Sequence, residues 1–373
     1  MRVPRPAMGK TTVSTFGGLS EACLKLRRVM AFIVWKNSKG FIKVLVLKEK
    51  RVLITGGAGT IGQALLAHIL KSEAPALVKV LDIDGNRLRE AGSKFSATTR
   101  LEFIQGDICN TDTAQNATQG VDVVFHLAAE KDVVVCEKNP AQALASNFQA
   151  TRTLFHAANR NGVTDFVFTS SDKAVYPANI LGRTKRLSEK FLTGKAIRAS
   201  RMKSMIVRFG NVLGSNGSVT EIFREQIRRQ APLTLTHPDM TRFIMGKEQA
   251  VGLLTQALRT GEHGDTLVMM MPATRVLHLA EAMRSLHLER SGIDLPIEHI
   301  GLRPGEKMEE HLMTSEEAQR ADTRGNFFII PALANAVKKE TVATVPMSSA
   351  ATPSLGVEDL KHLLLEYGIM SEK

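Results

Sequence analysis

The chain has 373 residues, of which 43% are hydrophobic and 23% charged, so it is long enough to bury one large core or two unequal lobes. Its cysteines, Cys23, Cys109 and Cys136, are far apart and in no paired spacing, which argues against a disulfide framework or a zinc site and favours a reducing cytoplasm. A net charge of +12 would ordinarily suggest nucleic acid as a partner, but residues 1–48 hold ten Lys and Arg against one acid, a net +9, and leave only +3 for the rest. We therefore expect no nucleic-acid partner.

The basic excess belongs to a leader, residues 1–48. Its longest uninterrupted apolar run, Val29 to Trp35, is far shorter than the roughly 20 residues that a membrane span needs. No small-residue cleavage site follows this run, so a secretory signal is not indicated. Two interpretations stay open: a basic surface anchor with at most peripheral membrane contact, or a non-catalytic extension in front of a true start at Met30. We assign the leader no function.

A regular alternation of strand-like and helix-like segments begins at residue 51. Residues 51–55 are a short run rich in branched side chains, and residues 64–70 follow at helical spacing. Further strand-like runs lie at 78–82, 101–104, 121–125, 166–169 and 205–207. Such alternation is typical of a parallel sheet with helices on both faces. The sequence therefore predicts an α/β fold, a Rossmann-like doubly wound parallel sheet, over residues 49–210.

The pattern of predicted segments changes after residue 210. Shorter, mixed segments indicate a smaller C-terminal substrate-binding lobe over residues 211–330, placed over the carboxyl edge of the sheet, with room for the chain to cross back to it. Residues 331–355 are rich in Ala, Thr, Ser, Pro and Lys and are typical of a linker. An amphipathic C-terminal helix is expected within residues 356–373.

A glycine-rich turn joins the first predicted strand to the first predicted helix. Its glycines, Gly56, Gly59 and Gly62, have the G-x-x-G-x-x-G spacing of a dinucleotide site. They allow a tight turn, a close approach of the pyrophosphate and close packing of helix on strand, while the helix N-terminus attracts the anion. Asp82 ends the second predicted strand, where its carboxylate can accept hydrogen bonds from a ribose. No arginine follows it directly, so the pattern favours NAD over NADP.

Two further stretches, residues 106–108 and 125–129, accompany this turn. Together with the glycine spacing they resemble the extended short-chain dehydrogenase/reductase superfamily. The resemblance implies that Asp107 lies near the adenine, that the two alanines of the second stretch let the chain pass close to the cofactor, and that Asn147 lies behind the nicotinamide half. The expected cofactor-binding residues are Gly56, Gly59, Thr60, Ile61, Gly62, Asp82, Asp107, Ile108, Ala128, Ala129, Asn147 and Lys185.

Residues 170–185 closely resemble the S-T-D-K-A-V-x-P-x-N-x-[MY]-G-x-T-K signature of the polysaccharide-biosynthesis (CapD-like) branch of this superfamily, which includes UDP-N-acetylglucosamine 4,6-dehydratases. The resemblance continues in family order through 207–219, 238–243 and 301–307 and covers roughly residues 49–330. It implies a UDP-sugar substrate.

The usual catalytic tyrosine of the superfamily is missing. In most such enzymes the lysine of a Tyr-x-x-x-Lys pair lowers the tyrosine pKa, and the phenolate removes a hydroxyl proton. Here Leu181 occupies the tyrosine slot, and Tyr176 stands at a variable position of the signature, where we expect packing or a minor substrate contact. The slot is Met in the large membrane-anchored dehydratases of the branch, so an apolar residue is compatible with activity. Arg183 is a further departure from the signature.

An adjacent carboxylate and ammonium, Asp172 and Lys173, offer an acid and a base. Dehydration passes through a 4-ketone, which acidifies the C5 proton for a base while an acid protonates the departing C6 hydroxyl. We assign Asp172 as the acid at C6 and Lys173 as the base at C5. Ser171 would hydrogen-bond the C4 oxygen, and Lys185 would hold the nicotinamide ribose. The acceptor of the C4 hydroxyl proton stays open between Asp172 and a water molecule.

Residues in other motifs are candidates for binding the substrate. Arg242 and Arg303 suit the diphosphate because planar guanidinium groups match phosphate oxygens. Glu306 is expected to position Arg303 or to contact a ribose. By resemblance, Asn211 and Lys131 lie on the substrate side. The histidines show no ligand spacing, so no metal is expected.

The leading hypothesis is a cytoplasmic, homo-oligomeric UDP-N-acetylglucosamine 4,6-dehydratase that uses NAD and serves surface polysaccharide or glycan biosynthesis. One alternative is a UDP-N-acetylhexosamine 4-epimerase, which would return the hydride to C4 and need no acid at C6. A second alternative, suggested by Leu181, is a catalytically degenerate NAD-binding regulatory protein. Neither the hexose nor an added inversion at C5 follows from the sequence.

Overall fold

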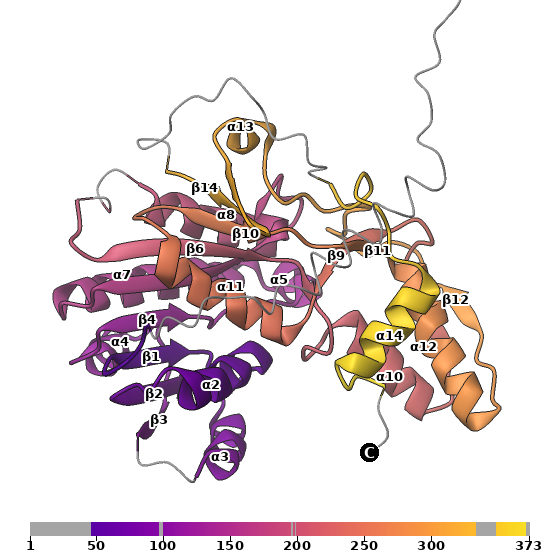
Figure 1. Cartoon of the computed structure of the whole chain (residues 1–373), viewed down its shortest axis with the longest axis horizontal. Helices are drawn as coiled ribbons and strands as arrows, with labels where there is room; N and C mark the ends of the chain where they lie inside the picture. Colours follow the sequence, from indigo (N-terminus) through magenta and orange to yellow (C-terminus); the bar gives the residue numbers. More distant parts are fainter. Residues whose placement is uncertain (1–45, 97–99, 195–196, 198, 333–347, 371–373) are drawn as a thin grey trace, which may run out of the picture.

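The computed structural model describes residues 46–96, 100–194, 197, 199–332 and 348–370 (Figure 1). The predicted leader lies outside the described residues apart from its last three positions. Among these, Leu47 is fully buried in the core of the larger body, and its backbone N–H donates to Glu73 Oε2 at 3.2 Å. The packed part of the chain therefore includes residues that the sequence assigns to the leader.

A long sheet forms the centre of the larger body. In the described part of the chain its nine strands follow the order β13-β14-β10-β6-β5-β4-β1-β2-β3. The seven neighbouring strands β10, β6, β5, β4, β1, β2 and β3 are parallel. Beside β10, strands β14 and β13 continue the sheet antiparallel. The strands are β1 (Arg51–Thr55), β2 (Leu77–Asp82), β3 (Leu101–Gln105), β4 (Val123–His126), β5 (Asp165–Ser171), β6 (Lys203–Phe209), β10 (Thr266–Met269), β13 (Asp322–Arg324) and β14 (Phe327–Ile330). The predicted doubly wound α/β fold is confirmed, and the six predicted strand runs coincide with β1 to β6.

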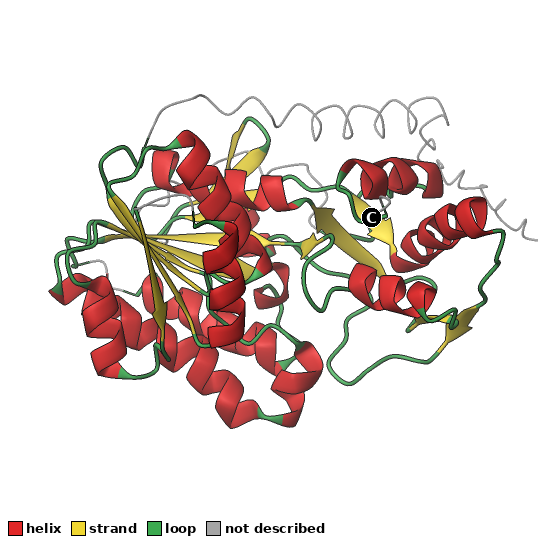
Figure 2. Ribbon diagram, turned by 90° about the horizontal axis from the view of Figure 1, so that it is seen from below, coloured by secondary structure: helices red, strands yellow, loops and turns green. Residues whose placement is uncertain are grey.

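Helices cover both faces of this sheet, as Figure 2 shows with the sheet seen edge-on and its strands overlapping. On one face α2 (Thr60–Ser72) packs beside α11 (Lys247–Thr260), and on the other lie α4 (Thr111–Thr118), α7 (Ala150–Arg160) and α8 (Ile180–Leu192). The remaining helical segments of this body are α3 (Gly85–Lys94), α5 (Val133–Lys138), α6 (Pro140–Leu144), the π-helix η2 (Ala145–Gln149), the 3-10 turn η3 (Asp172–Ala174) and α13 (Ser315–Ala318). Because both faces are covered, the central strands are near-continuous apolar runs, and residues 52–55 of β1 are all buried.

A smaller lobe lies beyond the end of β6, which runs into β7 with only Gly210 between them. It contains a three-stranded sheet, β11-β9-β7, and a two-stranded sheet, β12-β8, which helices cover to form a second apolar core (Figure 1). Its elements are β7 (Asn211–Val212), α10 (Val219–Arg228), β8 (Leu233–Leu235), β9 (Thr241–Met245), β11 (Ala273–Arg275), α12 (Val276–Ser291), β12 (Ile297–His299) and α14 (Val357–Glu366).

The chain crosses between the two bodies several times. After β9 it returns to the large sheet through α11 and β10, and after β12 it returns again to form β13 and β14. Residues 348–355 of the predicted linker run back to the lobe, where Ser349 and Leu355 are buried, and residues 333–347 lie outside the described residues. The predicted terminal helix is present as α14, packed against α12. Within the described ranges, no helix is both long and apolar enough to cross a membrane.

Candidate active site

The glycine-rich turn lies between β1 and α2, at the carboxyl end of the parallel strands. Gly56 has a φ of +65°, and a Cβ on it would lie 2.7 Å from the backbone nitrogen of Ala128. A Cβ on Gly62 would lie 2.5 Å from the Cα of Gly57, so this glycine lets α2 pack onto the turn. The N-cap of α2, Gly59, provides no side-chain cap, and the first turn carries no acidic residue. The first backbone N–H groups of α2 are therefore left for an anion.

The carboxylate of Asp82 closes the turn from the end of β2. It accepts hydrogen bonds from the backbone N–H groups of Ala58 and Asp84, both at 3.1 Å. Past the end of β3, the exposed Asp107 accepts from the backbone N–H of Cys109 at 2.8 Å. Four more of the predicted cofactor-binding residues lie at this end of the sheet: Thr60 and Ile61 in the first turn of α2, Ile108 after β3, and Ala129 after β4. The residues predicted for the adenosine half thus lie at the ends of adjacent strands.

Two further predicted cofactor-binding residues, Asn147 and Lys185, have buried side chains. The Asn147 amide accepts from the Glu130 N–H at 2.8 Å and donates to the Glu130 carbonyl at 3.0 Å, so it fixes the loop after β4. The Lys185 ammonium donates to the carbonyl of Thr169 at 2.8 Å and ties α8 to β5. Burial lowers the pKa of Lys185 to about 8.

Ser171, Asp172 and Lys173 form the turn at the end of β5. The Ser171 hydroxyl donates to Asp172 Oδ1 at 2.9 Å, and the Lys173 ammonium donates to the same oxygen at 3.1 Å. Asp172 is 1% exposed, and its Oδ2 has no hydrogen-bond partner among the described residues. Because burial disfavours the charged form, the pKa of Asp172 is raised. The structure therefore brings the predicted acid, base and hydroxyl into one contact group.

Helix α8 packs directly against this turn, and Gly182 makes that possible. A Cβ on Gly182 would lie 2.2 Å from the carbonyl oxygen of Lys173. The preceding residue, Leu181, fills the tyrosine slot, is 4% exposed, and belongs to a small apolar cluster with Cys136. An apolar residue in this slot therefore serves packing.

A second buried carboxylate, Glu310, faces Lys173 from the loop after β12. Its Oε1 lies 3.5 Å from Lys173 Nζ, and its Oε2 lies 2.6 Å from Lys307 Nζ. Burial alone would lower the pKa of Lys173, but the carboxylates of Asp172 and Glu310 outweigh it and raise this pKa. Burial would raise the pKa of Glu310, but Lys173, Arg242 and Lys307 lower it. Glu310 is not among the residues predicted from the sequence, because it stands beyond the last recognised motif, residues 301–307. Its i,i+3 spacing from Lys307 was the one local sign of an ion pair.

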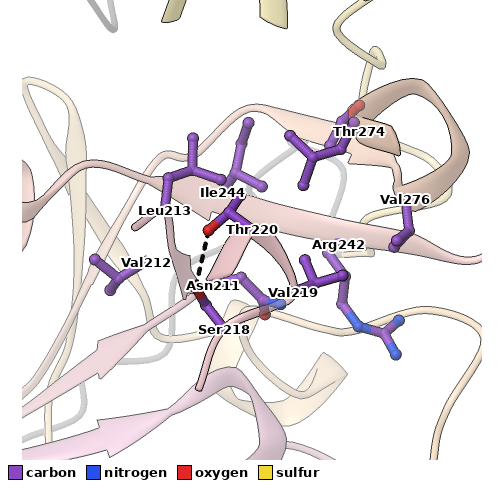
Figure 3. Close-up of a pocket in the computed structure, with 11 residues that line it drawn as sticks. Asn211, Val212, Leu213, Ser218, Val219, Thr220, Arg242, Ile244, Thr274 and Val276 are labelled. Carbon is purple, nitrogen blue, oxygen red and sulfur yellow. Dashed lines mark hydrogen bonds between the residues drawn. The ribbon is translucent and has the colours of Figure 1, made fainter. Parts of the chain in front are cut away.

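Asn211 and Arg242 line a pocket in the smaller lobe (Figure 3). Asn211 Oδ1 accepts from the Lys173 ammonium at 3.4 Å. The Arg242 guanidinium donates to the carbonyls of Thr241 at 2.7 Å and Lys307 at 2.9 Å, so here it braces the loop before Glu310. The pocket holds about 310 Å³, its mouth included. Its apolar lining comes from Val212, Leu213, Val219, Ile244, Val276 and Leu279.

The other predicted substrate residues lie in two loops. The Lys131 ammonium donates to the carbonyl of Asn216, whose N–H donates to Thr60 Oγ1 at 3.1 Å, so a loop of the lobe closes onto the glycine-rich turn. The Glu306 carboxylate accepts from the backbone N–H of Arg303 at 3.0 Å and stabilises a tight turn. The Arg303 guanidinium makes no hydrogen bond or ion pair with any residue that the structure describes.

Comparisons with known proteins identify the family and the fold relatives of this chain. The sequence model of a family described as polysaccharide biosynthesis protein matches residues 52–332. A UDP-glucose 4-epimerase of Rickettsia bellii is 34% identical over 338 residues, which cover 87% of this chain and 98% of that protein. The X-ray structure of Pen from Bacillus thuringiensis has a TM-score of 0.81 and 35% identity, over 86% of this chain and 98% of that one. The dTDP-glucose 4,6-dehydratase DesIV from Streptomyces venezuelae has a TM-score of 0.61 over 69% of this chain and 86% of its own, and at 24% identity it supports the fold alone.

Proposed function

Because the chain belongs to the polysaccharide biosynthesis protein family, we propose that it removes water from UDP-N-acetylglucosamine and forms a 4-keto-6-deoxy sugar, with NAD as its resident cofactor. At a coarser level, it is a nucleotide-sugar-modifying enzyme of the kind that includes epimerases and dehydratases. The observation that carries the finer proposal is the buried contact of Asp172 with Lys173 and Ser171, an acid and a base side by side.

The residues at the carboxyl end of the sheet fit a dinucleotide. A Cβ on Gly59 would meet only the Gly56 carbonyl, at 3.2 Å, so among the described residues the space above the turn is open where a pyrophosphate would face the N-terminus of α2. The Asp82 carboxylate accepts from two backbone N–H groups and keeps lone pairs for a ribose diol. NAD bound there would accept the hydride from C4 of the sugar and return it at C6. Lys185 would hold the nicotinamide ribose.

In the proposed reaction the side chains of Ser171, Asp172 and Lys173 carry the protons. Asp172 takes the C4 hydroxyl proton, relayed by the Ser171 hydroxyl that already donates to it, and then delivers this proton to the departing C6 hydroxyl. Lys173 removes the C5 proton and later returns it to C5. The product therefore differs from the substrate by one water molecule, and both side chains end as they began. The raised pKa of Asp172 suits a group that must take and then release a proton.

Lys173 must be neutral before it can act as a base. Asp172 and Glu310 raise its pKa, so it rests as an ammonium near neutrality. Its side chain is 18% exposed, which gives the ammonium proton a route to water. We therefore expect the dehydration rate to rise with pH as Lys173 loses its proton.

The diphosphate is assigned to the two arginines. The Arg303 guanidinium has no partner among the described residues, and Arg242 lines the pocket. A planar guanidinium can donate two parallel hydrogen bonds to phosphate oxygens.

The proposal is tested by incubating the purified chain with NAD and UDP-N-acetylglucosamine and analysing the product by mass spectrometry. A product lighter by one water molecule supports dehydration. Asp172→Asn should abolish this product, because the amide cannot donate an acidic proton to the C6 hydroxyl. Asp165→Asn, at the opposite end of β5, is the matched control and should leave the yield unchanged. A wild-type product of unchanged mass would exclude dehydration.

The second candidate is a 4-epimerase, which the name of the Rickettsia relative favours. In that reaction the hydride returns to the other face of C4, and no acid at C6 takes part. The product would then keep the mass of the substrate while its chromatographic mobility changes. Asp172→Asn does not separate the two reactions, because epimerisation also needs an acceptor for the C4 hydroxyl proton.

A further inference from the structure

We propose that Glu310 is a further positioning residue of this site, which holds the Lys173 ammonium against Asp172, and that residues 348–355 hold Glu310 in place. The inference rests on the proposed role of Lys173 as the C5 base. It goes beyond that role because it makes a segment outside the family match, which ends at residue 332, part of the catalytic arrangement.

The Glu310 carboxylate lies between two lysine ammonium groups, those of Lys173 and Lys307. It is 1% exposed, with Oε1 3.5 Å from Lys173 Nζ and Oε2 2.6 Å from Lys307 Nζ. Lys307 also donates to the carbonyl of Val175, just after the catalytic turn, at 3.1 Å. The Lys173 ammonium is therefore held from two sides, by Asp172 at 3.1 Å and by Glu310. Such bracing keeps a long, flexible side chain aimed at one atom of a substrate.

The backbone of Glu310 is fixed by Ser349 in turn. The Glu310 N–H donates to Ser349 Oγ at 3.0 Å, and the Ser349 N–H donates to the Glu310 carbonyl at 2.8 Å. The Ser349 hydroxyl also lies 2.8 Å from Thr241 Oγ1 and donates to the Thr241 carbonyl at 3.2 Å. Ser349 is 1% exposed, so these contacts are sheltered from water. They join the C-terminal segment to Glu310 and to the residue that precedes Arg242.

The charge of Glu310 also affects when Lys173 becomes a base. The charged groups that act on Lys173 are Asp172 on its own turn, Glu310 on the loop after β12, and Arg242 on β9. The two carboxylates favour the ammonium and the guanidinium opposes it. Removing the Glu310 charge leaves one carboxylate against Arg242, so the pKa of Lys173 must fall.

The test is Glu310→Gln, which keeps the size of the side chain and removes its charge. We expect the rise of kcat with pH to move to lower pH by about one unit or more, because an opposite charge at this distance shifts a pKa by about 1 to 3. We also expect kcat on the alkaline plateau to fall by about tenfold or more as the ammonium loses its second anchor, with KM little changed. Ser349→Ala should also move the rise of kcat to lower pH and reduce the plateau kcat, but by less than Glu310→Gln does. Glu309→Gln, the same charge change at the adjacent residue, is the control and should match the wild type.

A second readout separates this inference from the proposed reaction. The rate at which an amine-reactive reagent labels Lys173, measured by peptide mass spectrometry against pH, reports its titration without turnover. Labelling of Glu310→Gln that starts at lower pH than in the wild type supports the inference, even where no dehydration is seen and the proposed function has failed. Unshifted labelling and an unshifted rate profile in Glu310→Gln would overturn the inference, even if the wild type dehydrates its substrate. A rate that falls equally at every pH would leave only a structural role.

Discussion

Glu317→Gln is expected to destabilise the fold strongly, because Glu317 neutralises the buried guanidinium of Arg208. Arg208 on β6 is 1% exposed and forms paired hydrogen bonds with two carboxylates, those of Glu317 at 2.7 and 2.8 Å and of Glu189 at 2.8 Å each. Arg186 joins both carboxylates, at 2.9 Å from Glu317 and 2.8 Å from Glu189. The group therefore balances two positive charges with two negative ones.

The size of the effect follows from this balance. The glutamine keeps the volume and one acceptor, but it leaves the buried guanidinium of Arg208 and the partly exposed one of Arg186 facing a single carboxylate. Breaking a buried ion pair by removing one partner costs about 3 to 5 kcal/mol. We expect a loss of about 3 kcal/mol in the free energy of unfolding, at the lower end because Arg186 is partly exposed and Glu189 remains.

The assay is urea unfolding followed by circular dichroism. The matched control is Glu316→Gln on the neighbouring residue, whose side chain is 72% exposed and lies 3.5 Å from Arg320, and which should lose less than about 0.5 kcal/mol. Arg208 and Arg186 lower the pKa of Glu317 in the folded chain. The stabilisation it provides is therefore complete above its unfolded pKa of about 4.3 and is lost as pH falls toward the folded value. The difference in the free energy of unfolding between the wild type and Glu317→Gln should be constant above about pH 5 and become smaller below about pH 4. An unchanged midpoint, or a deficit that is as large at pH 3 as at pH 7, would refute the reasoning.

Three further substitutions test other contacts. Gly182→Ala should lower kcat by more than about tenfold and stability by about 1 to 3 kcal/mol, because its Cβ would lie 2.2 Å from the Lys173 carbonyl; steady-state kinetics and thermal unfolding measure both. Asp82→Ala should weaken NAD binding by about 10- to 100-fold in calorimetry, since a charged acceptor for the ribose is lost. Leu181→Tyr should not raise activity, and it should destabilise the fold by about 1 to 3 kcal/mol, because that position is packed beside Cys136. A variant that is more active and equally stable would contradict the packing role of Leu181.

The parts of the fold that could be predicted are those with a strong local pattern. Strands β1, β2, β4, β5 and β6 are buried on both faces, so each is a short apolar run, whereas the edge strand β3 is only partly buried. The glycine spacing of 56–62 is visible without any tertiary information. The strands of the lobe are two to five residues long, too short for a periodicity to be read. The return of residues 322–330 to the sheet depends on pairing of β14 with β10, a distant contact that no local pattern encodes.

The same distinction applies to the site. Ser171, Asp172 and Lys173 are adjacent in one signature, so their contact could be expected from their position at a strand end. Glu310 reaches Lys173 from a different lobe, and Ser349 reaches Glu310 from a segment with the composition of a linker. Neither belongs to a recognised motif. Arg242 was predicted as a diphosphate ligand from its motif, but its bonds to the backbone of the 307 loop depend on that loop folding against β9.

The most direct test of the proposed reaction follows one hydrogen atom. UDP-N-acetylglucosamine labelled with deuterium at C4 is incubated with the purified chain and NAD in ordinary water, and the product is examined by nuclear magnetic resonance. We predict a 4-keto-6-deoxy product that carries the deuterium at C6, since the hydride taken from C4 is returned there. A product with the deuterium still at C4, and with an inverted hydroxyl at that carbon, would contradict dehydration and establish epimerisation.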